Sequence, residues 1–424
     1  MDLFHIARDE HGLTPEEIRS ALLQSLEGRQ LNKVLIIPPD ATRYHSGAGF
    51  ITCEYYKTLR ARGVQVDVMP ALGTHDPLTE AQAAMMYPDI PFEELLPHNW
   101  RTDVVKLGEV PGQFISDITE GLWTDSLSVE INRRVLDPSY DLILSVGQVV
   151  PHAVVGMANH SKNLFVGVGG SDMINNTHMV GAIYGLERIM GKDHTPVRQI
   201  FDYALEHYLA DLPVLYVMTV TTACNMDIYT HGLFIGTGRN CLEEAIRLSE
   251  QKNIVFLPHS LRKCVTYLDP TEMHSTWIGN KAIYRTRMAM DDDSELIILA
   301  PGVEKFGEDP TIDTLIRKYG YLGREHTIHN FRKPENQDLR DNMGTTAHLI
   351  HGSHDGRFKV TYAVKKISIE EMNAVGYDAI PYDDAIKRYD PQKLVPGVNT
   401  LEDGEEIYYI PNPAIGLWIS QERF

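Results

Sequence analysis

Cysteine is scarce in this sequence, with four among 424 residues. Cys53, Cys224, Cys241 and Cys264 form no CxxC pair, and no two of them lie close together in the chain. Small secreted domains depend on dense cysteine patterns, so this sparse set predicts free thiols in a reducing compartment.

Long apolar runs are missing as well. No run approaches the roughly 20 residues that a helix needs to span a bilayer. The first residues, MDLFHIARDEHG, carry charges where a secretion signal needs an apolar core. We therefore expect a cytoplasmic protein.

Positive charge is in deficit. The chain has 39 Lys and Arg against 58 Asp and Glu, which gives a formal net charge of −19. This balance argues against a nucleic-acid backbone or an anionic membrane as the main partner. It is compatible with a small anionic substrate, because a few cations can dominate one pocket. The oligomeric state cannot be read from the sequence.

Strand and helix patterns alternate through the first half of the chain. LTPEEIRSALLQSLEGR predicts a helix that Thr14 caps, with Pro15 at its first position and Glu17 completing a capping box. Apolar strands are expected at 33–40, 64–71 and 141–150, with a helix near 47–62. This alternation predicts an α/β fold with a mostly parallel, Rossmann-like sheet.

The chain is long for one hydrophobic core and comfortable for two. A second α/β series begins after about 250, with KNIVFLP and SELIILAPGV as its clearest strands. We expect an N-terminal domain over 1–250 that carries the functional loops. A smaller α/β domain is expected over 255–405, with a cleft between the two. The tail at about 410–424 is expected to pack back on the first domain.

Three loops carry the residue types that chemistry needs. PPDATRYH offers Asp40 and Arg43, and GTHDP offers His75. In open α/β sheets, ligands bind beyond the carboxyl ends of the strands, so these loops can converge. An arginine there can hold a carboxylate with two parallel hydrogen bonds. Taken singly, each loop is equally compatible with a polar turn.

The third loop, PHAVVGMANHSKNLFVGVGGSDMINNTH, contains His152, Lys162 and His178 at separations of ten and sixteen residues. Its glycines would let backbone N–H groups approach a ligand closely. Imidazole suits nickel, copper and zinc, and a sheltered lysine can become a nucleophile for covalent attachment of a cofactor. Surface histidines on a loop are the alternative interpretation.

Several motifs resemble those of the lactate racemase family. They are PDxTR, GTH, and PH followed by a Lys ten residues later and a His sixteen residues after that Lys. They stand in the family's order with closely matching gaps, over roughly 33–285. The resemblance implies a racemase or epimerase, an isomerase of 2-hydroxy acids. It also implies a nickel-pincer nucleotide, a pyridinium thioamide/thiocarboxylate mononucleotide with nickel, and cofactor-biosynthesis proteins that supply it.

The resemblance assigns roles to individual residues. Lys162 corresponds to the lysine that binds the cofactor through a thioamide, with Gly169 and Gly170 beside it. His178 corresponds to the histidine that completes nickel coordination. The remaining correspondences are His75 and His152 as the acid/base pair, and Arg43, Asp40, Trp277 and Lys281 as substrate-binding residues.

The chemistry of a 2-hydroxy acid agrees with these roles. Removal of the C2 hydrogen as a proton is hard, because the adjacent carboxylate is already negative. Removal as a hydride leaves a flat 2-keto acid, and a cofactor must accept it because side chains are poor hydride acceptors. Hydride return to the other face inverts C2. Two faces call for two bases, and the unperturbed pKa of histidine, near 6.5, suits that task.

Some positions depart from the family's pattern. Ser161 and His160 stand where lactate racemases carry arginine and glycine, and Trp277 replaces a tyrosine. These changes affect the pocket wall, so we expect a substrate other than lactate. Candidates are longer, aromatic or polyhydroxylated 2-hydroxy acids, including aldonic acids such as gluconate.

Two other functions are compatible with parts of the pattern. A zinc hydrolase would use His152, His160 and His178, although no HExxH-type helix is present. A non-enzymatic nickel or cofactor carrier would need Lys162 and His178 but not His75.

A second histidine group has no assigned role. In AHLIHGSHDG, His348, His351 and His354 are three residues apart. They are compatible with a metal site, a packed helix end or the lining of a pocket.

Overall fold

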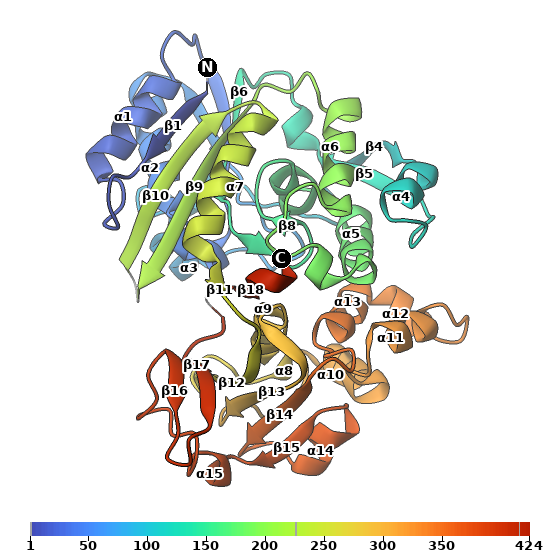
Figure 1. Ribbon diagram of the computed structural model, residues 1–424. Coiled ribbons are helices and arrows are strands. Elements are labelled where there is room, and N and C mark those ends of the chain that lie inside the picture. The colour runs from blue at the N-terminus through green and yellow to red at the C-terminus, as the bar shows by residue number, and fades with distance from the viewer. Residues whose placement is uncertain (1, 225–226, 415) are drawn as a thin grey trace. The chain divides into compact units, whose positions relative to one another are not determined.

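The computed structural model describes residues 2–224, 227–414 and 416–424. The chain forms two compact units (Figure 1). Met1–Val180 and Ile189–Asn253 make up the first, and Gly181–Arg188 and Ile254–Phe424 make up the second. Among the described helices, none is long and apolar enough to cross a membrane. The prediction of a two-domain α/β fold is confirmed.

The first unit is built on a six-stranded sheet in the order β1-β10-β9-β6-β2-β3. Strands β9, β6, β2 and β3 run parallel, whereas β10 and the edge strand β1 pair antiparallel. The bounds are β1 Leu3–Ile6, β2 Lys33–Ile37, β3 Gln65–Val68, β6 Leu142–Gln148, β9 Val214–Cys224 and β10 Asp227–Gly236. The three predicted strands are β2, β3 and β6, and their parallel pairing brings their carboxyl ends to one edge of the sheet.

Helices flank this sheet, with α1 and α2 on one face and α7 on the other (Figure 1). The longer helices are α1 Pro15–Ser25, α2 Ala48–Ala61, α5 Ser171–Tyr184, α6 Pro196–Tyr208 and α7 Arg239–Asn253. The shorter ones are η1 Ala41–Ser46, α3 Glu80–Met86, η2 Phe92–Glu94, α4 Gly112–Ile118, η3 Arg133–Leu136 and the π-helix η4 Asn163–Gly167. The last residues of α5 and the short helix η5 Leu186–Arg188 belong to the second unit.

Alternation along the strands explains how the sheet is covered. In β2, Val34 and Ile36 belong to the core that α1 and α2 cover, while Leu35 and Ile37 are buried on the opposite face. Because both faces are covered, the strand reads as a continuous apolar run. The predicted start of α1 is confirmed, since Thr14 and Glu17 form the reciprocal capping box.

Two small hairpins lie outside the main sheet of the first unit. β4 (Val104–Val110) pairs antiparallel with β5 (Leu127–Asn132). β7 (Pro151–His152) pairs antiparallel with β8 (Gly156–Met157), directly after β6. The second hairpin therefore begins at the carboxyl edge of the sheet.

The second unit has its own six-stranded sheet in the order β15-β14-β13-β12-β17-β16, parallel except at β16. The strands are β12 Leu261–Tyr267, β13 Met290–Ala300, β14 Lys359–Val364, β15 Asp378–Pro381, β16 Gly397–Thr400 and β17 Glu406–Ile410. In the tail, β18 (Trp418–Ser420) pairs in parallel with β11 (Val255–Leu257) of the same unit.

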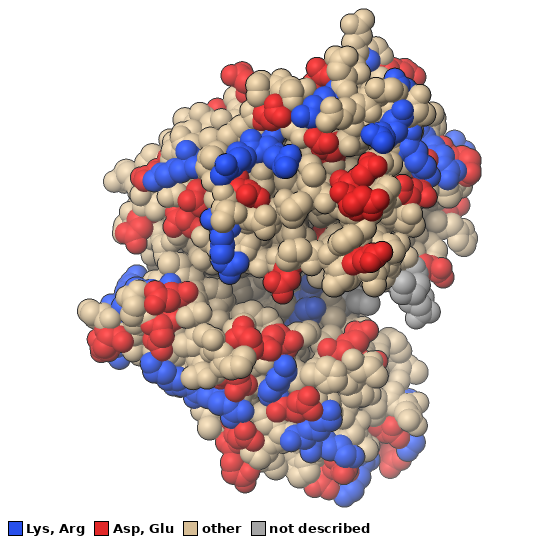
Figure 2. Space-filling view, turned by 180° about the vertical axis from the view of Figure 1, so that it is seen from behind, with Lys and Arg blue, Asp and Glu red and all other residues tan. Residues whose placement is uncertain are grey.

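Helices of the second unit follow its strands. They are α8 Thr276–Gly279, α9 Lys281–Thr286, α10 Pro310–Tyr319, α11 Arg324–Phe331, α12 Gln337–Asp341, α13 Met343–His351, α14 Ile369–Ala374, α15 Tyr382–Ala385 and η6 Gln421–Arg423. On the face of the molecule in Figure 2, Lys and Arg side chains lie interspersed with Asp and Glu.

Candidate functional site

Asp40 and His75 form a hydrogen-bonded pair at the edge of the first sheet. Asp40 follows β2 and is 5% exposed, and its Oδ2 lies 2.5 Å from Nδ1 of His75. Its Oδ1 accepts the backbone N–H of Thr42 at 3.1 Å. Burial alone would raise the pKa of Asp40, but the hydrogen bonds from His75 and Thr42 hold it below its ordinary value. An ionised carboxylate therefore orients an imidazole that remains 59% exposed.

A tight turn after β3 brings His75 to this position. Gly73 has a φ of +58°, which favours glycine. Its N–H donates to the carbonyl of Gly167 at 2.8 Å, which ties the turn to the π-helix η4. The predicted loops at Asp40, His75 and Lys162 are thus brought together.

Arg43 lies in η1 three residues after Asp40, and its side chain is exposed. Among the described residues it has no ion-pair partner, although the chain carries 58 acidic residues. Its positive charge contributes to lowering the pKa values of Asp40 and Lys162, so it lies near both. Such a guanidinium can bind the carboxylate of a ligand.

Lys162 stands immediately before η4 and is half-buried. Burial, followed by the charges of Arg43 and Arg198, lowers the pKa of Lys162 to about 7. A substantial fraction of this amine is therefore neutral near pH 7 and can act as a nucleophile.

His178 lies in the middle of α5, and its Nδ1 is 2.6 Å from the carbonyl oxygen of Ile174. Since a carbonyl only accepts, Nδ1 carries the hydrogen and Nε2 has the lone pair. Burial, only partly opposed by this hydrogen bond, lowers the pKa of His178 to about 4. Metal-binding histidines commonly combine a neutral ring with a backbone partner on the other nitrogen, so His178 fits a metal ligand.

His152 lies on the β7–β8 hairpin beyond the carboxyl end of β6. Its Nδ1 accepts the backbone N–H of Val154 at 3.1 Å. Strand β6 lies beside β2 in the sheet, so His152 belongs to the same edge as Asp40.

Gly169 and Gly170 are required by packing. A Cβ at Gly169 would lie 1.9 Å from the carbonyl oxygen of Phe165, and one at Gly170 would lie 1.8 Å from Oε2 of Glu130. The space beside both glycines is therefore occupied by protein. Their role in binding a cofactor stays a prediction.

Trp277 and Lys281 belong to the second unit, on α8 and α9. The ring of Trp277 lies 4.2 Å from that of His348, centroid to centroid. Nε2 of His348 lies 3.1 Å from the hydroxyl oxygen of Tyr321. Burial lowers the pKa of His348 to about 3, so a neutral imidazole supports Trp277. Of the three interpretations of this histidine group, the packed helix end describes His348 and His351 at the end of α13.

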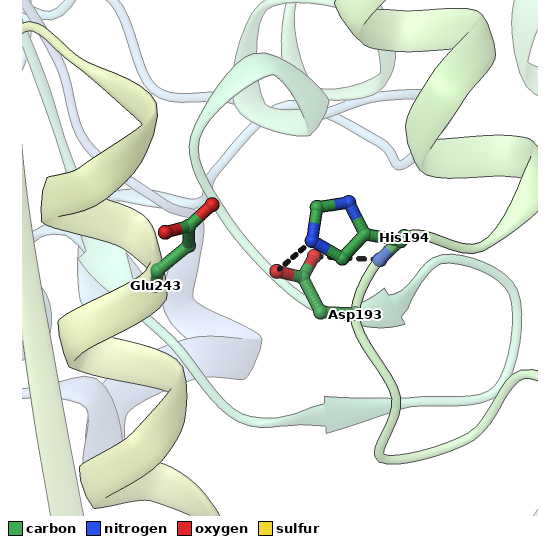
Figure 3. A group of neighbouring side chains, drawn as sticks. All are labelled: Asp193, His194 and Glu243. Carbon is green, nitrogen blue, oxygen red and sulfur yellow. Dashed lines mark hydrogen bonds and ion pairs between the residues drawn. The ribbon is translucent and has the colours of Figure 1, made fainter.

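The histidines of the zinc alternative do not form a metal site. Among the described residues, three ligand atoms converge within 4.8 Å only at Asp193, His194 and Glu243 (Figure 3). This group already has a cation, because Arg239 forms ion pairs with Asp193 and Glu243. The zinc hydrolase based on His152, His160 and His178 is therefore not supported.

Sequence reasoning missed Arg198 and Asn163. Arg198 on α6 is 1% exposed, and its guanidinium donates to the carbonyls of Met157 and Asn159 and to Oγ of Ser161. It therefore holds the segment that leads into Lys162.

Nδ2 of Asn163 donates to the carbonyl of Ile37 and to Oγ of Ser145, which joins η4 to two strand ends. Nothing in the sequence distinguishes either residue from a surface polar group.

Comparisons with known proteins concern the family and the fold. The family model described as the lactate racemase N-terminal domain matches residues 15–188, which include every candidate residue of the first unit. Among curated proteins, none matches this chain.

Two solved structures share the fold. A crystal structure of a protein from Thermotoga maritima has a TM-score of 0.78 at 21% identity, over 98% of this chain and 100% of that one. The lactate racemase apoprotein from Thermoanaerobacterium thermosaccharolyticum has a TM-score of 0.69 at 15% identity, over 96% and 93%.

Proposed function

We propose that this protein is an isomerase that inverts C2 of a 2-hydroxy acid, because the family model described as the lactate racemase N-terminal domain matches residues 15–188. The observation that carries the proposal is the meeting of three features at one sheet edge. They are the Asp40–His75 pair, the guanidinium of Arg43, for which the described residues offer no ion-pair partner, and the low-pKa amine of Lys162. Together they offer a proton acceptor, a carboxylate-binding cation and an attachment point.

The cofactor that the family resemblance implies fits two of these residues. Lys162 is poised as an amine nucleophile, and His178 presents Nε2 of a neutral ring. We propose that Lys162 holds the nickel-pincer nucleotide as a thioamide and that His178 binds its nickel. When bound, this group supplies the hydride acceptor that side chains lack.

The chain's own residues perform the remaining tasks. Arg43 binds the substrate carboxylate through two parallel hydrogen bonds. Nε2 of His75 takes the proton of the C2 hydroxyl, and Asp40 stabilises the imidazolium that results. His152, on its hairpin, is the second acid/base histidine and serves the opposite configuration of C2. Loss of the hydroxyl proton makes departure of the C2 hydrogen as hydride favourable, because the oxygen's electron pair then forms the carbonyl.

The substrate is proposed to be larger or more polar than lactate. Trp277 carries one N–H donor but no hydroxyl, and its ring is supported by His348. The replacement of a tyrosine by Trp277 is the basis for proposing a longer, aromatic or polyhydroxylated 2-hydroxy acid, such as an aldonate that is epimerised at C2. Lys281 follows on the next helix, and its part in substrate binding stays a prediction.

Intact-mass measurement tests the attachment point. The protein is produced together with proteins that build the cofactor, and its mass is compared with that of Lys162→Ala and of Lys106→Ala. Lys106 is an exposed lysine on β4 and serves as the matched control. We expect an adduct in the wild type and in Lys106→Ala but not in Lys162→Ala. The same adduct on Lys162→Ala would refute the assignment.

A screen of 2-hydroxy acids with the loaded protein tests the activity. We expect C2 inversion of at least one acid larger than lactate. An adduct without any isomerisation would favour the carrier alternative, for which the Asp40–His75 pair would have no use.

A further inference from the structure

The chain bends through left-handed backbone just before Lys162. Asn159 has a φ of +73° and His160 a φ of +58°. Among the described residues, they are the only two adjacent non-glycine residues with positive φ. Backbone of this kind costs free energy for residues that carry a Cβ, and it persists only where the surrounding structure holds it. The position of Lys162, two residues further on, therefore depends on what holds this bend.

The side chains of the bend supply little of this support. Oδ1 of Asn159 accepts the backbone N–H of His160 at 2.7 Å, which is a contact within the bend itself. The ring of His160 stacks on that of Tyr216, with 3.9 Å between the centroids. Both ring nitrogens of His160 are buried, however, and no described residue forms a hydrogen bond with either of them. Hydrogen-bonded support for the bend therefore comes from elsewhere in the fold.

Arg198 on α6 provides this support. Its Nη2 donates to the carbonyl of Met157 at 2.7 Å and to that of Asn159 at 3.2 Å. Its Nη1 donates to the same carbonyl of Asn159 at 3.2 Å and to Oγ of Ser161 at 2.9 Å. One planar guanidinium thus holds acceptors before, within and after the bend, which the single nitrogen of a lysine cannot span.

The charge of Arg198 is buried without a carboxylate beside it. The residue is 1% exposed, and among the described residues it has no ion-pair partner. Asp202 is reached only through Ser161, whose hydroxyl donates to Oδ1 of Asp202 at 3.0 Å. Burial of an unpaired charge is costly. Since no carboxylate neutralises it directly, the positive charge of Arg198 acts on Lys162 and contributes to lowering the pKa of that amine.

Lys162 is fixed on its other side as well. The backbone N–H of Asn163 donates to the carbonyl of His160 at 2.9 Å. Nδ2 of Asn163 donates to the carbonyl of Ile37 on β2 and to Oγ of Ser145 on β6. Lys162 therefore lies between a bend that Arg198 holds and a helix, η4, that the sheet holds.

We propose that Arg198 is a positioning residue for Lys162: its guanidinium holds the left-handed bend and thereby presents the lysine amine to a ligand in the site. The identity of that ligand, the cofactor that Lys162 would carry, rests on the proposed function. The positioning does not, because it is a property of the apoprotein. Loss of Arg198 should relax the bend, expose the amine to solvent and remove a neighbouring positive charge. The last two changes both favour the protonated amine, which is not nucleophilic.

Four charged or titratable groups interact with the amine of Lys162. Arg43 on η1 and Arg198 on α6 lower its pKa, whereas Asp40 after β2 raises it. His178 on α5 is affected by the charge of Lys162 in turn. Of these four, Arg198 is the one that also holds the backbone before Lys162. Its substitution should therefore change the amine while the other three groups stay in place.

Competitive acetylation of the apoprotein measures this amine directly. Trace acetic anhydride reacts with neutral lysine amines, and peptide mass spectrometry quantifies each site over a range of pH. Lys393, an exposed lysine of the second unit, is the internal standard. In the wild type we expect labelling of Lys162 to follow a pKa of about 7. In Arg198→Met we expect this pKa to rise by about one unit or more, which gives about tenfold weaker labelling below the midpoint, relative to the plateau at high pH.

Ile200→Ala is the matched control. Ile200 is a fully buried residue of the same helix, and its apolar side chain makes none of these hydrogen bonds. We expect this variant to melt at a lower temperature while the pKa of Lys162 stays unchanged. If Arg198→Met also melts at a lower temperature but leaves the pKa of Lys162 unchanged, Arg198 is only a structural residue and the proposal is overturned.

Two milder variants test the bend itself and do not depend on the folding of Arg198→Met. Arg198→Lys keeps the charge but not the planar group, so the pKa of Lys162 should still rise, by less than in Arg198→Met. Asn159→Gly removes the strain of left-handed backbone at that position, so adding it to Arg198→Lys should reduce the rise. A wild-type pKa in Arg198→Lys, or the same rise with and without the glycine, would overturn the proposal. The proposed function fails separately, if these pKa values behave as expected and the intact-mass measurement finds no adduct on Lys162.

Discussion

His178 has the features that we propose prepare a single side chain for metal binding. The carbonyl of Ile174 accepts a hydrogen bond from Nδ1–H of His178, and burial lowers the pKa of His178 to about 4. Protons therefore compete for Nε2 only as the pH falls toward that value. The lowered pKa also means that the folded protein binds fewer protons than the unfolded chain between about 4 and 6.5, so His178 costs stability as the pH falls through this window.

This assignment predicts which variants lose metal binding and which lose only turnover. His178→Ala should lose both nickel and activity, whereas His75→Ala should keep nickel and lose activity. Elemental analysis of protein produced with the cofactor-building proteins, at pH 7 and at about pH 6, measures the metal. Wild-type protein should retain it at both pH values. Equal loss of nickel in both variants would place His75 among the metal ligands.

Arg43 provides a prediction about the substrate. Lysine at this position keeps the charge but loses the planar pair of donors. Arg43→Lys should therefore lower kcat/KM by about 10–100-fold, the equivalent of about 1.5–3 kcal/mol for a charged hydrogen bond. Steady-state kinetics on the acid found in the screen measures the effect. Unchanged kinetics would remove Arg43 from the site.

Among the elements, the π-helix η4 joins the loops of the candidate site. Its close turn brings the carbonyl oxygen of Phe165 to within 1.9 Å of the position that a Cβ at Gly169 would take. Because that atom belongs to the backbone, Gly169→Ala must distort the helix that follows Lys162. We expect a loss of about 1–3 kcal/mol, as for other overpacked sites. Thermal unfolding of the apoprotein should show a lower melting temperature.

Gly344 offers the matched control for this variant. It lies in α13, and a Cβ there would meet nothing within 4 Å. Gly344→Ala should be neutral or stabilising by up to about 1 kcal/mol. Equal melting temperatures for Gly169→Ala and the wild type would show that η4 tolerates a side chain and that its packing does not fix Lys162.

Elements were more predictable than the contacts between them. The capping box of α1 and the apolar strands β2, β3 and β6 follow from neighbouring residues, so the sequence was sufficient. The hydrogen bond between Asp40 and His75 spans 35 positions, and only the folded sheet edge brings the two together. Motif order predicted that the two residues act at one site, which stays a prediction, and it gave no sign of the bond.

Other features of the site left no signal in the sequence. The π-helix depends on close backbone packing around Gly169, and a run such as NLFVG is equally compatible with an ordinary turn. Arg198 stands in an amphipathic helix, where arginine normally faces solvent, yet it is buried against the carbonyls before Lys162. Both depend on tertiary neighbours that local patterns do not encode.

On the scale of the whole molecule, the site gathers positive charge although the chain as a whole is acidic. The formal net charge is −19, yet the cations of Arg43 and Arg198 both act on Lys162. Positive charges that lie close together repel one another, which costs free energy. Binding of an anionic ligand would offset that cost. This local field therefore favours an anionic ligand.

The central claim is that C2 is inverted without loss of its hydrogen to water. A proton held on His75 or His152 would exchange with solvent whenever the site opens, whereas a hydride has no such route. The most direct measurement is therefore the reaction of a substrate deuterated at C2, in ordinary water, with the product analysed by mass spectrometry after one turnover. The account predicts inverted product that retains its deuterium and forms more slowly than from the protiated acid. Product that carries solvent hydrogen at C2 from the first turnover would contradict it.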